Sequence, residues 1–99
     1  SNYIELQTQK AYNKLFLEKS DKKIVLNLKV FNEQDNVIQK WLILKTIKEL
    51  NGSTDRIEKI HIEDIIKLCT NNIGNKYLTP NKNLKILVKD KKIFFINLN

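Results

Sequence analysis

Two side chains in this sequence have the chemistry of a nucleophile and a base. The chain has one cysteine, Cys69, and one histidine, His61. They lie eight residues apart on one predicted helix, so roughly two turns and about 12 Å separate them. A cysteine–histidine catalytic pair needs contact near 3 Å, roughly a hydrogen-bond distance, so these two residues do not form one. We expect Cys69 to pack in the core beside Ile62 and Ile65, and His61 to cap or pack at the start of its helix.

Other common catalytic and metal-binding patterns are missing from the sequence. One cysteine and one histidine cannot supply the ligand spacing of a zinc site. The two glycines lie far apart, and each marks the end of an element rather than a phosphate-binding loop. Glu63 and Asp64 are adjacent and therefore do not face one another on a helix. We expect them in the first turn of that helix, where the dipole favours negative charge. The sequence predicts no active site within these residues.

Lysine is the side chain with the clearest potential to bind a partner. Lys and Arg total 18 against 11 Asp and Glu, the formal net charge is +7 and the isoelectric point is about 9.5. Such an excess attracts polyanions, with nucleic acid the first candidate and a membrane surface the second. The competing interpretation is a lysine-rich composition without function. Lysine, a point charge, suits phosphate contact more than base reading. The predicted binding residues are Lys40, Lys45, Lys48, Lys82, Lys85, Lys89, Lys91 and Lys92.

Three aromatic residues are candidates for stacking with nucleic-acid bases. Trp41 lies on the apolar stripe of a predicted helix, so we expect it to pack in the core. Phe94 and Phe95 are adjacent in a predicted strand and must point to opposite faces of the sheet. One of these two rings is therefore predicted to be exposed, or to contact a neighbouring domain.

The elements that position these residues follow from hydrophobic periodicity. The predicted elements, in chain order, are helix 2–19, strand 24–30, helix 37–50, helix 61–71 and strands 76–79, 84–88 and 93–96. Gly52 ends the second helix, and residues 71–75 form a stop and turn signal. Pro80 cannot donate a ladder hydrogen bond, so we place it in a connection between strands. The expected fold class is α+β, with an N-terminal helix, one strand, two packed helices and a small antiparallel C-terminal sheet.

Composition limits the class of protein. Hydrophobic content of 41% and charged content of 29% are typical of a globular domain. No run of about 18 apolar residues is present, so we expect no membrane span. A single cysteine allows no internal disulfide and gives no sign of an oxidising compartment, so we expect a cytoplasmic protein. The chain begins with Ser1 and contains no Met, so we expect it to be a fragment of a longer protein.

An ordered set of short motifs is more specific than composition. A helix opens with Ile38-Gln-Lys-Trp-Leu42, and the next is entered by Ile60-His-Ile-Glu63. The segment Gly74 to Pro80 then leads to a strand end, and Lys92-Ile-Phe-Phe-Ile96 closes a hairpin. This order resembles the region that follows the catalytic domain of tRNA(Ile)-lysidine synthases. Departures from the family pattern include Asn81 after the proline and the lack of an arginine in the closing hairpin. No single hairpin side chain is therefore expected to read RNA bases.

The resemblance implies a parent enzyme that is a ligase. With ATP and Mg²⁺ it would attach lysine to the cytidine of the CAU anticodon of an isoleucine tRNA. The family's ATP-binding Ser-Gly-Gly-X-Asp-Ser loop does not occur in this chain, so the resemblance implies neither a catalytic residue nor a cofactor here. It implies that residues 1–99 form a single substrate-side domain that positions tRNA against the catalytic domain, and that residues 1–19 form a leading helix connected to that domain.

Two further functions remain open at the level of sequence. Two helices followed by a basic hairpin also describe a winged-helix DNA-binding domain. Against that interpretation, Glu63 and Asp64 at the start of the second helix would meet phosphates badly. The other alternative is a structural spacer between domains of the parent enzyme, in which the lysines are incidental. Preference for folded tRNA, sequence-selective binding of duplex DNA, and equal weak binding of all polyanions would separate the three functions.

Overall fold

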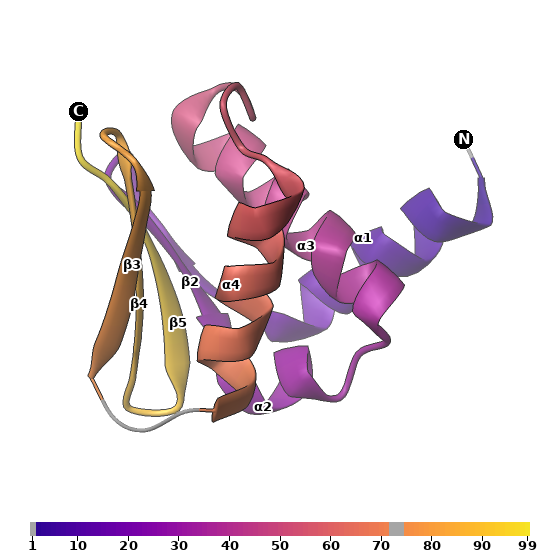
Figure 1. Ribbon diagram of the computed structural model, residues 1–99. Coiled ribbons are helices and arrows are strands. Elements are labelled where there is room, and N and C mark those ends of the chain that lie inside the picture. The colour runs from indigo at the N-terminus through magenta and orange to yellow at the C-terminus, as the bar shows by residue number, and fades with distance from the viewer. Residues whose placement is uncertain (1, 72–74) are drawn as a thin grey trace.

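Helices and sheet form two layers (Figure 1). The computed structural model describes residues 2–71 and 75–99, and in these residues four helices lie on one side of a five-stranded sheet. The strand order is β1-β2-β5-β4-β3, and every neighbouring pair is antiparallel. The predicted α+β class is confirmed. The elements are α1 (Tyr3–Leu15), β1 (Phe16–Lys19), β2 (Lys23–Asn27), α2 (Leu28–Asn32), α3 (Asn36–Asn51), α4 (Lys59–Asn71), β3 (Lys76–Asn81), β4 (Leu84–Lys89) and β5 (Lys92–Asn97).

The N-terminal helix is shorter than the sequence predicts. The Asn2 side chain caps α1 by accepting a hydrogen bond from the Glu5 amide at 2.9 Å. The helix ends at Leu15, and residues 16–19 form the edge strand β1, which pairs with β2. The prediction of one helix over residues 2–19 is therefore wrong beyond Leu15. Phe16 falls at a helical spacing from Tyr12, so the apolar pattern gives no sign of the boundary.

The strand predicted over residues 24–30 also ends early. The Asn27 side chain accepts a hydrogen bond from the Val30 amide at 2.9 Å, which caps the short helix α2. Leu28 and Phe31 of this helix are buried in the core. Leu28 and Val30 continue the alternation of β2 by coincidence, and a single polar cap changes the backbone from strand to helix.

The two central helices lie close to their predicted positions. Helix α3 ends at Gly52, which has φ of +86°, as expected for a left-handed stop. Helix α4 begins at Lys59 rather than His61, so Glu63 and Asp64 lie beyond its first turn and the prediction of dipole compensation is wrong. The stop signal predicted at 71–75 falls mainly on residues 72–74, which lie outside the described residues.

The C-terminal strands form the larger part of the sheet. The three predicted strands are present, and β2 pairs with β5, so the N-terminal hairpin extends the C-terminal sheet to five strands. Pro80 lies within β3 and not in a connection as predicted. Strand β3 is at the edge of the sheet, where a missing amide hydrogen is tolerated, and its pairing is irregular between Leu78 and Asn81. Asp90 and Lys91 connect β4 to β5 with φ of 52° and 62°, as in a two-residue turn of type I′.

One hydrophobic core fills the space between the sheet and the helices. Ile86 and Phe95 of the sheet and Leu42 and Ile65 of the helices are fully buried in it. Cys69 belongs to the same cluster, and burial raises the pKa of its thiol to about 12, so the predicted packing role is confirmed. No helix in the described part of the chain is long and apolar enough to cross a membrane.

Candidate nucleic-acid interface

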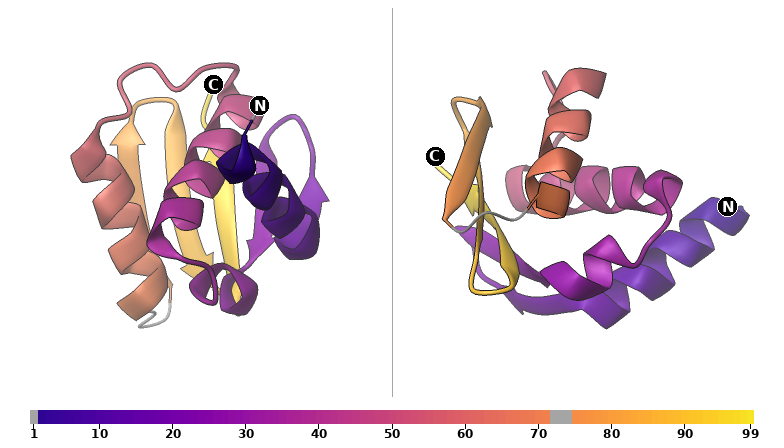
Figure 2. Two further views of the ribbon diagram at one scale, coloured as in Figure 1. Left: turned by 90° about the vertical axis from the view of Figure 1, so that its right-hand side faces the viewer. Right: turned by 60° about the horizontal axis from the view of Figure 1, so that its bottom comes forward.

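The side of the sheet that faces away from the helices carries a separate set of side chains. Figure 1 and the right-hand view of Figure 2 show the helices on one side of the sheet only. Successive residues of a strand point to opposite faces. In β4, Leu84, Ile86 and Val88 are buried in the core, so Lys85 and Lys89 point to the other side. We call this side the outer face.

Aromatic and apolar side chains form a row across the outer face. Directly paired residues of antiparallel strands point to the same side of the sheet. The pairings Val25↔Phe94, Phe94↔Leu87 and Leu87↔Tyr77 connect four strands in one line. Val25, near the middle of the sheet, is 2% exposed, whereas Tyr77 on edge strand β3 is 59% exposed. The row therefore offers an accessible ring at its β3 end.

Lysines lie on both sides of this row. Lys23 and Lys85 both pair with Ile96, and Lys89 pairs with Lys92 across the β4–β5 turn. The Lys85 ammonium is 4.6 Å from the centre of the Tyr77 ring, and the Lys89 ammonium is 6.0 Å from the centre of the Phe94 ring. Both distances are within the range of a cation–π interaction. The outer face therefore combines positive charge with aromatic rings.

Negative charge on the outer face is largely neutralised. Glu18 pairs with Val25 and so points to this face, and it forms an ion pair with Lys23 at 2.9 Å. Among the described residues, Lys85, Lys89 and Lys92 take part in no ion pair. We call these three residues the sheet lysines. Because no described carboxylate neutralises their ammonium groups, these lysines can bind an external anion.

The eight predicted lysines do not share one surface. Lys40, Lys45 and Lys48 belong to α3, on the helix side of the core. Lys45 is held between α1 and α3 by an ion pair with Glu49 at 3.3 Å and lies 5.1 Å from the Tyr12 ring centre. Lys91 is in the β4–β5 turn beside Lys89 and Lys92, whereas Lys82 is in the β3–β4 turn at the opposite end of the sheet. The structure therefore brings Lys89, Lys91 and Lys92 together at one end of the sheet, whereas Lys85 lies on the outer face toward the β3–β4 turn that contains Lys82.

The aromatic predictions have mixed outcomes. Phe95 is fully buried and Phe94 lies on the outer face with intermediate exposure, so the prediction of one buried and one outward ring is confirmed. Trp41 is 44% exposed, and the prediction that it packs in the core is wrong. Sequence reasoning did not single out Tyr77 or Lys23. Their places on the outer face depend on strand register, which no sequence signal in this chain specifies.

The remaining candidate residues have structural roles. The His61 imidazole accepts a hydrogen bond from the Glu58 amide at 2.9 Å, so His61 caps α4 as expected. The Tyr12 hydroxyl donates to the Glu49 carboxylate at 2.9 Å. Burial, aided by this hydrogen bond, raises the pKa of Tyr12 above its ordinary value. No group of three or more possible metal ligands occurs in residues 2–71 and 75–99.

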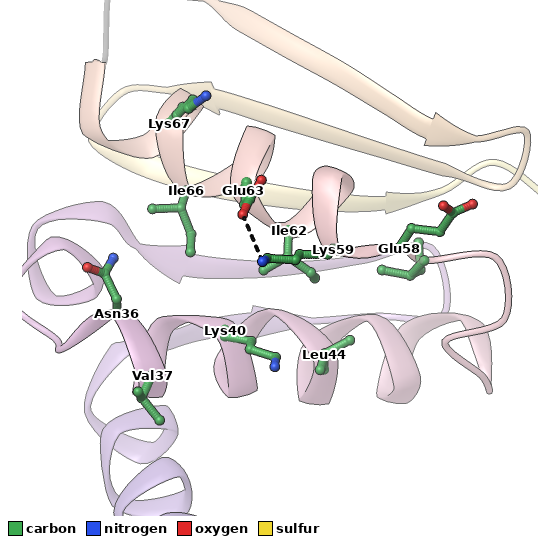
Figure 3. Close-up of a pocket in the computed structure, with 11 residues that line it drawn as sticks. Asn36, Val37, Lys40, Leu44, Glu58, Lys59, Ile62, Glu63, Ile66 and Lys67 are labelled. Atoms are coloured by element: carbon green, nitrogen blue, oxygen red, sulfur yellow. Dashed lines mark ion pairs between the residues drawn. The ribbon is translucent and has the colours of Figure 1, made fainter.

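A groove lies between α3 and α4 (Figure 3) and has a volume of about 800 Å³. Val37 and Leu44 line it from α3, and Ile62 and Ile66 line it from α4. Charges of both signs surround it, among them Lys40 and a Lys59–Glu63 ion pair at 4.0 Å. Its lining contains no cysteine, serine, threonine or histidine. Mixed charge and an apolar floor fit a polyanion less well than the outer face does.

Comparison with known proteins gives one point of reference. No family model matches the chain. A tRNA(Ile)-lysidine synthase of Clostridioides difficile (strain 630) is 28% identical to it over 97 residues, which are 98% of this chain and 21% of that protein. The chain therefore spans about a fifth of the length of the curated relative it matches. The match is distant and partial, and it supports a relationship between this chain and one domain of a tRNA(Ile)-lysidine synthase.

Proposed function

We propose that this chain is an accessory tRNA-binding domain of an ATP-dependent tRNA(Ile)-lysidine synthase, and that it binds tRNA phosphates through its outer face. The observation that carries the binding role is the outer face itself, where the sheet lysines have no ion-pair partner among the described residues. The similarity to a tRNA(Ile)-lysidine synthase over 98% of the chain makes tRNA the favoured polyanion. In the parent enzyme this domain would position the anticodon of isoleucine tRNA against the catalytic domain.

ATP and Mg²⁺ do not fit the residues present in this chain. The described residues hold no cluster of three metal-ligating side chains, and the sequence has no glycine-rich phosphate loop. A nucleotide and its cation would therefore be held by another part of the parent enzyme. We expect the isolated chain to bind tRNA without consuming ATP.

The binding role is tested with two triple variants, one on the outer face and one on the helices. Lys85, Lys89 and Lys92 are changed together to Gln in the first variant. In the second, Lys40 and Lys48 of α3 and Lys67 of α4 are changed to Gln. Both variants lose the same charge, and all six residues lie outside the buried core. Titration of labelled isoleucine tRNA, followed by fluorescence anisotropy, should show a clear loss of affinity in the first variant and a much smaller loss in the second. Circular dichroism checks that both variants fold.

Equal losses of tRNA affinity in the two variants would contradict a binding interface on the outer face. They would favour the spacer function, in which the charge is diffuse. Duplex DNA in a parallel titration tests the winged-helix function. A wing projects from its domain, whereas the β4–β5 hairpin is flanked on both sides by β3 and β2. Sequence-selective binding of duplex DNA would overturn the proposed function.

A further inference from the structure

We infer that the outer face binds unpaired nucleotides of RNA, and that Tyr77 is the side chain on which a base stacks. This inference rests on the proposed function and adds the class of RNA segment that the face accepts. The alternative ligand is the phosphate backbone of a duplex, which would need the lysines but not the ring.

Tyr77 contributes little to the packing of the fold. Its neighbour Leu78 packs against the core, whereas Tyr77 points to the outer face and is 59% exposed. Its cross-strand partner Leu87 is the next residue of the aromatic row. A large ring left this accessible on a sheet edge is available to an external planar group, and nucleobases are planar groups that stack on tyrosine.

The ring and its nearest ammonium group together match one nucleotide. The Lys85 ammonium lies 4.6 Å from the Tyr77 ring centre. A base that stacks on this face of the ring would displace the ammonium group, and the flexible Lys85 side chain would remain close enough to contact the phosphate of the same nucleotide. Phe94 and Lys89 form a second pair of this kind, with 6.0 Å between the ring centre and the ammonium group. Phe94 is on β5, two strands from the β3 strand that carries Tyr77. Two strand spacings are about 9.5 Å, so the two rings would accept separate bases.

Geometry and charge together favour single-stranded RNA over duplex RNA as the ligand of the outer face. In a duplex the bases stack on one another and offer no free face to a protein ring, whereas bases in loops and ends do. The broad sheet cannot enter the deep, narrow major groove of double-stranded RNA. Two carboxylates lie near these lysines: Glu18, which is ion-paired to Lys23, and Asp90 of the β4–β5 turn, so positive charge is in excess. This imbalance favours an anionic ligand over an apolar protein partner.

The test compares a short labelled oligouridine with an RNA duplex of equal phosphate count, using anisotropy with the 99-residue chain. Changing Tyr77 to Ala should weaken oligouridine binding about 5- to 150-fold, the range expected for one lost base–ring contact. Duplex binding should not change. The matched control Y77F keeps the ring and should keep the affinity. A second ligand, the same oligomer with abasic positions, should bind wild type and Y77A equally.

The outcomes separate this inference from the proposed function. If oligouridine affinity is unchanged in Y77A, or if duplex affinity falls by the same factor, base stacking on Tyr77 is overturned. The lysine variants described above would still decide whether tRNA binds to this face. If neither tRNA nor oligouridine binds the wild-type chain, both proposals fail. Thermal unfolding of Y77A, expected to match that of wild type because the ring is exposed, excludes a folding defect.

Discussion

Cys69 and His61, the residues best suited to chemistry by type, serve the structure instead. Cys69 is fully buried among the apolar side chains of the core, and His61 caps a helix. Burial raises the pKa of the Cys69 thiol to about 12, so the thiol stays protonated and unreactive at neutral pH. At the scale of single residues, the accessible chemistry of this chain is therefore that of ammonium groups and aromatic rings.

The buried thiol makes the free energy of unfolding vary with pH in the alkaline range. An unfolded cysteine ionises near 9.0, whereas native Cys69 stays protonated up to about 12. Between these values the native state binds more protons, so the free energy of unfolding falls as the pH rises, by up to about 1.4 kcal/mol per pH unit. The variant C69A should lack this part of the fall. Urea unfolding of both proteins, followed by circular dichroism from neutral to alkaline pH, measures the difference.

Tyr12 does not confuse this comparison. Burial also raises the pKa of Tyr12, so it lowers alkaline stability in wild type and variant alike. The difference between the two proteins isolates Cys69. If the two stability profiles stay parallel above the pKa of an unfolded thiol, the buried thiol does not cause the effect.

The sequence predicts elements better than it predicts their ends. Gly52 correctly marks the end of α3, because only a residue that tolerates positive φ fits there. By contrast, the border at Phe16 and the cap at Asn27 are decided by pairing and by one side-chain hydrogen bond, to which apolar periodicity is insensitive. The outer face illustrates the same limit. Lysine content predicts a cationic surface, but only strand register places Tyr77 beside Lys85.

At one position of the β4–β5 turn, the residue present is less favourable for stability than glycine would be. Its second residue, Lys91, has φ of 62°, a conformation that a side chain disfavours and glycine adopts freely. We expect the variant K91G to raise the free energy of unfolding by about 1 kcal/mol. For a domain of this size the melting temperature would rise by about 4–8 °C. Differential scanning calorimetry checks this.

The same variant separates stability from binding. K91G removes one positive charge beside Lys89 and Lys92, so a tRNA titration should show slightly weaker binding by a more stable protein. The variant K91N tolerates the left-handed conformation better than lysine and loses the same charge, so it provides the matched control. A lower melting temperature in both variants would show that the Lys91 side chain stabilises the turn.

At the scale of the whole molecule, the separation of the two layers decides how binding responds to salt. The helices cover one side of the sheet, so the sheet lysines form a small cationic surface apart from the lysines of α3. Each phosphate contact contributes about −0.7 to −0.9 to the slope of log affinity against log salt. With three contacts, we expect a slope of about −2 to −3 for tRNA. Anisotropy titrations over a series of salt concentrations measure it.

The variant with Gln at Lys85, Lys89 and Lys92 should have a slope close to zero. A slope in wild type much steeper than this range would mean that lysines beyond the outer face, such as Lys40 and Lys48, also touch the RNA. An unchanged slope in the Gln variant would place the phosphate contacts elsewhere on the molecule.

The two edge strands of the sheet limit association between copies of the chain at high concentration. Strand β1 is four residues long and carries Glu18 and Lys19, and strand β3 contains Pro80, which has no amide hydrogen to offer. Both are devices that stop a strand of a second molecule from extending a sheet. Bound polyanion would cancel the repulsion that keeps like-charged copies apart. Even so, neither described edge strand would offer neighbouring molecules a long regular template, so a polyanion-bound form of the domain is expected to remain dispersed.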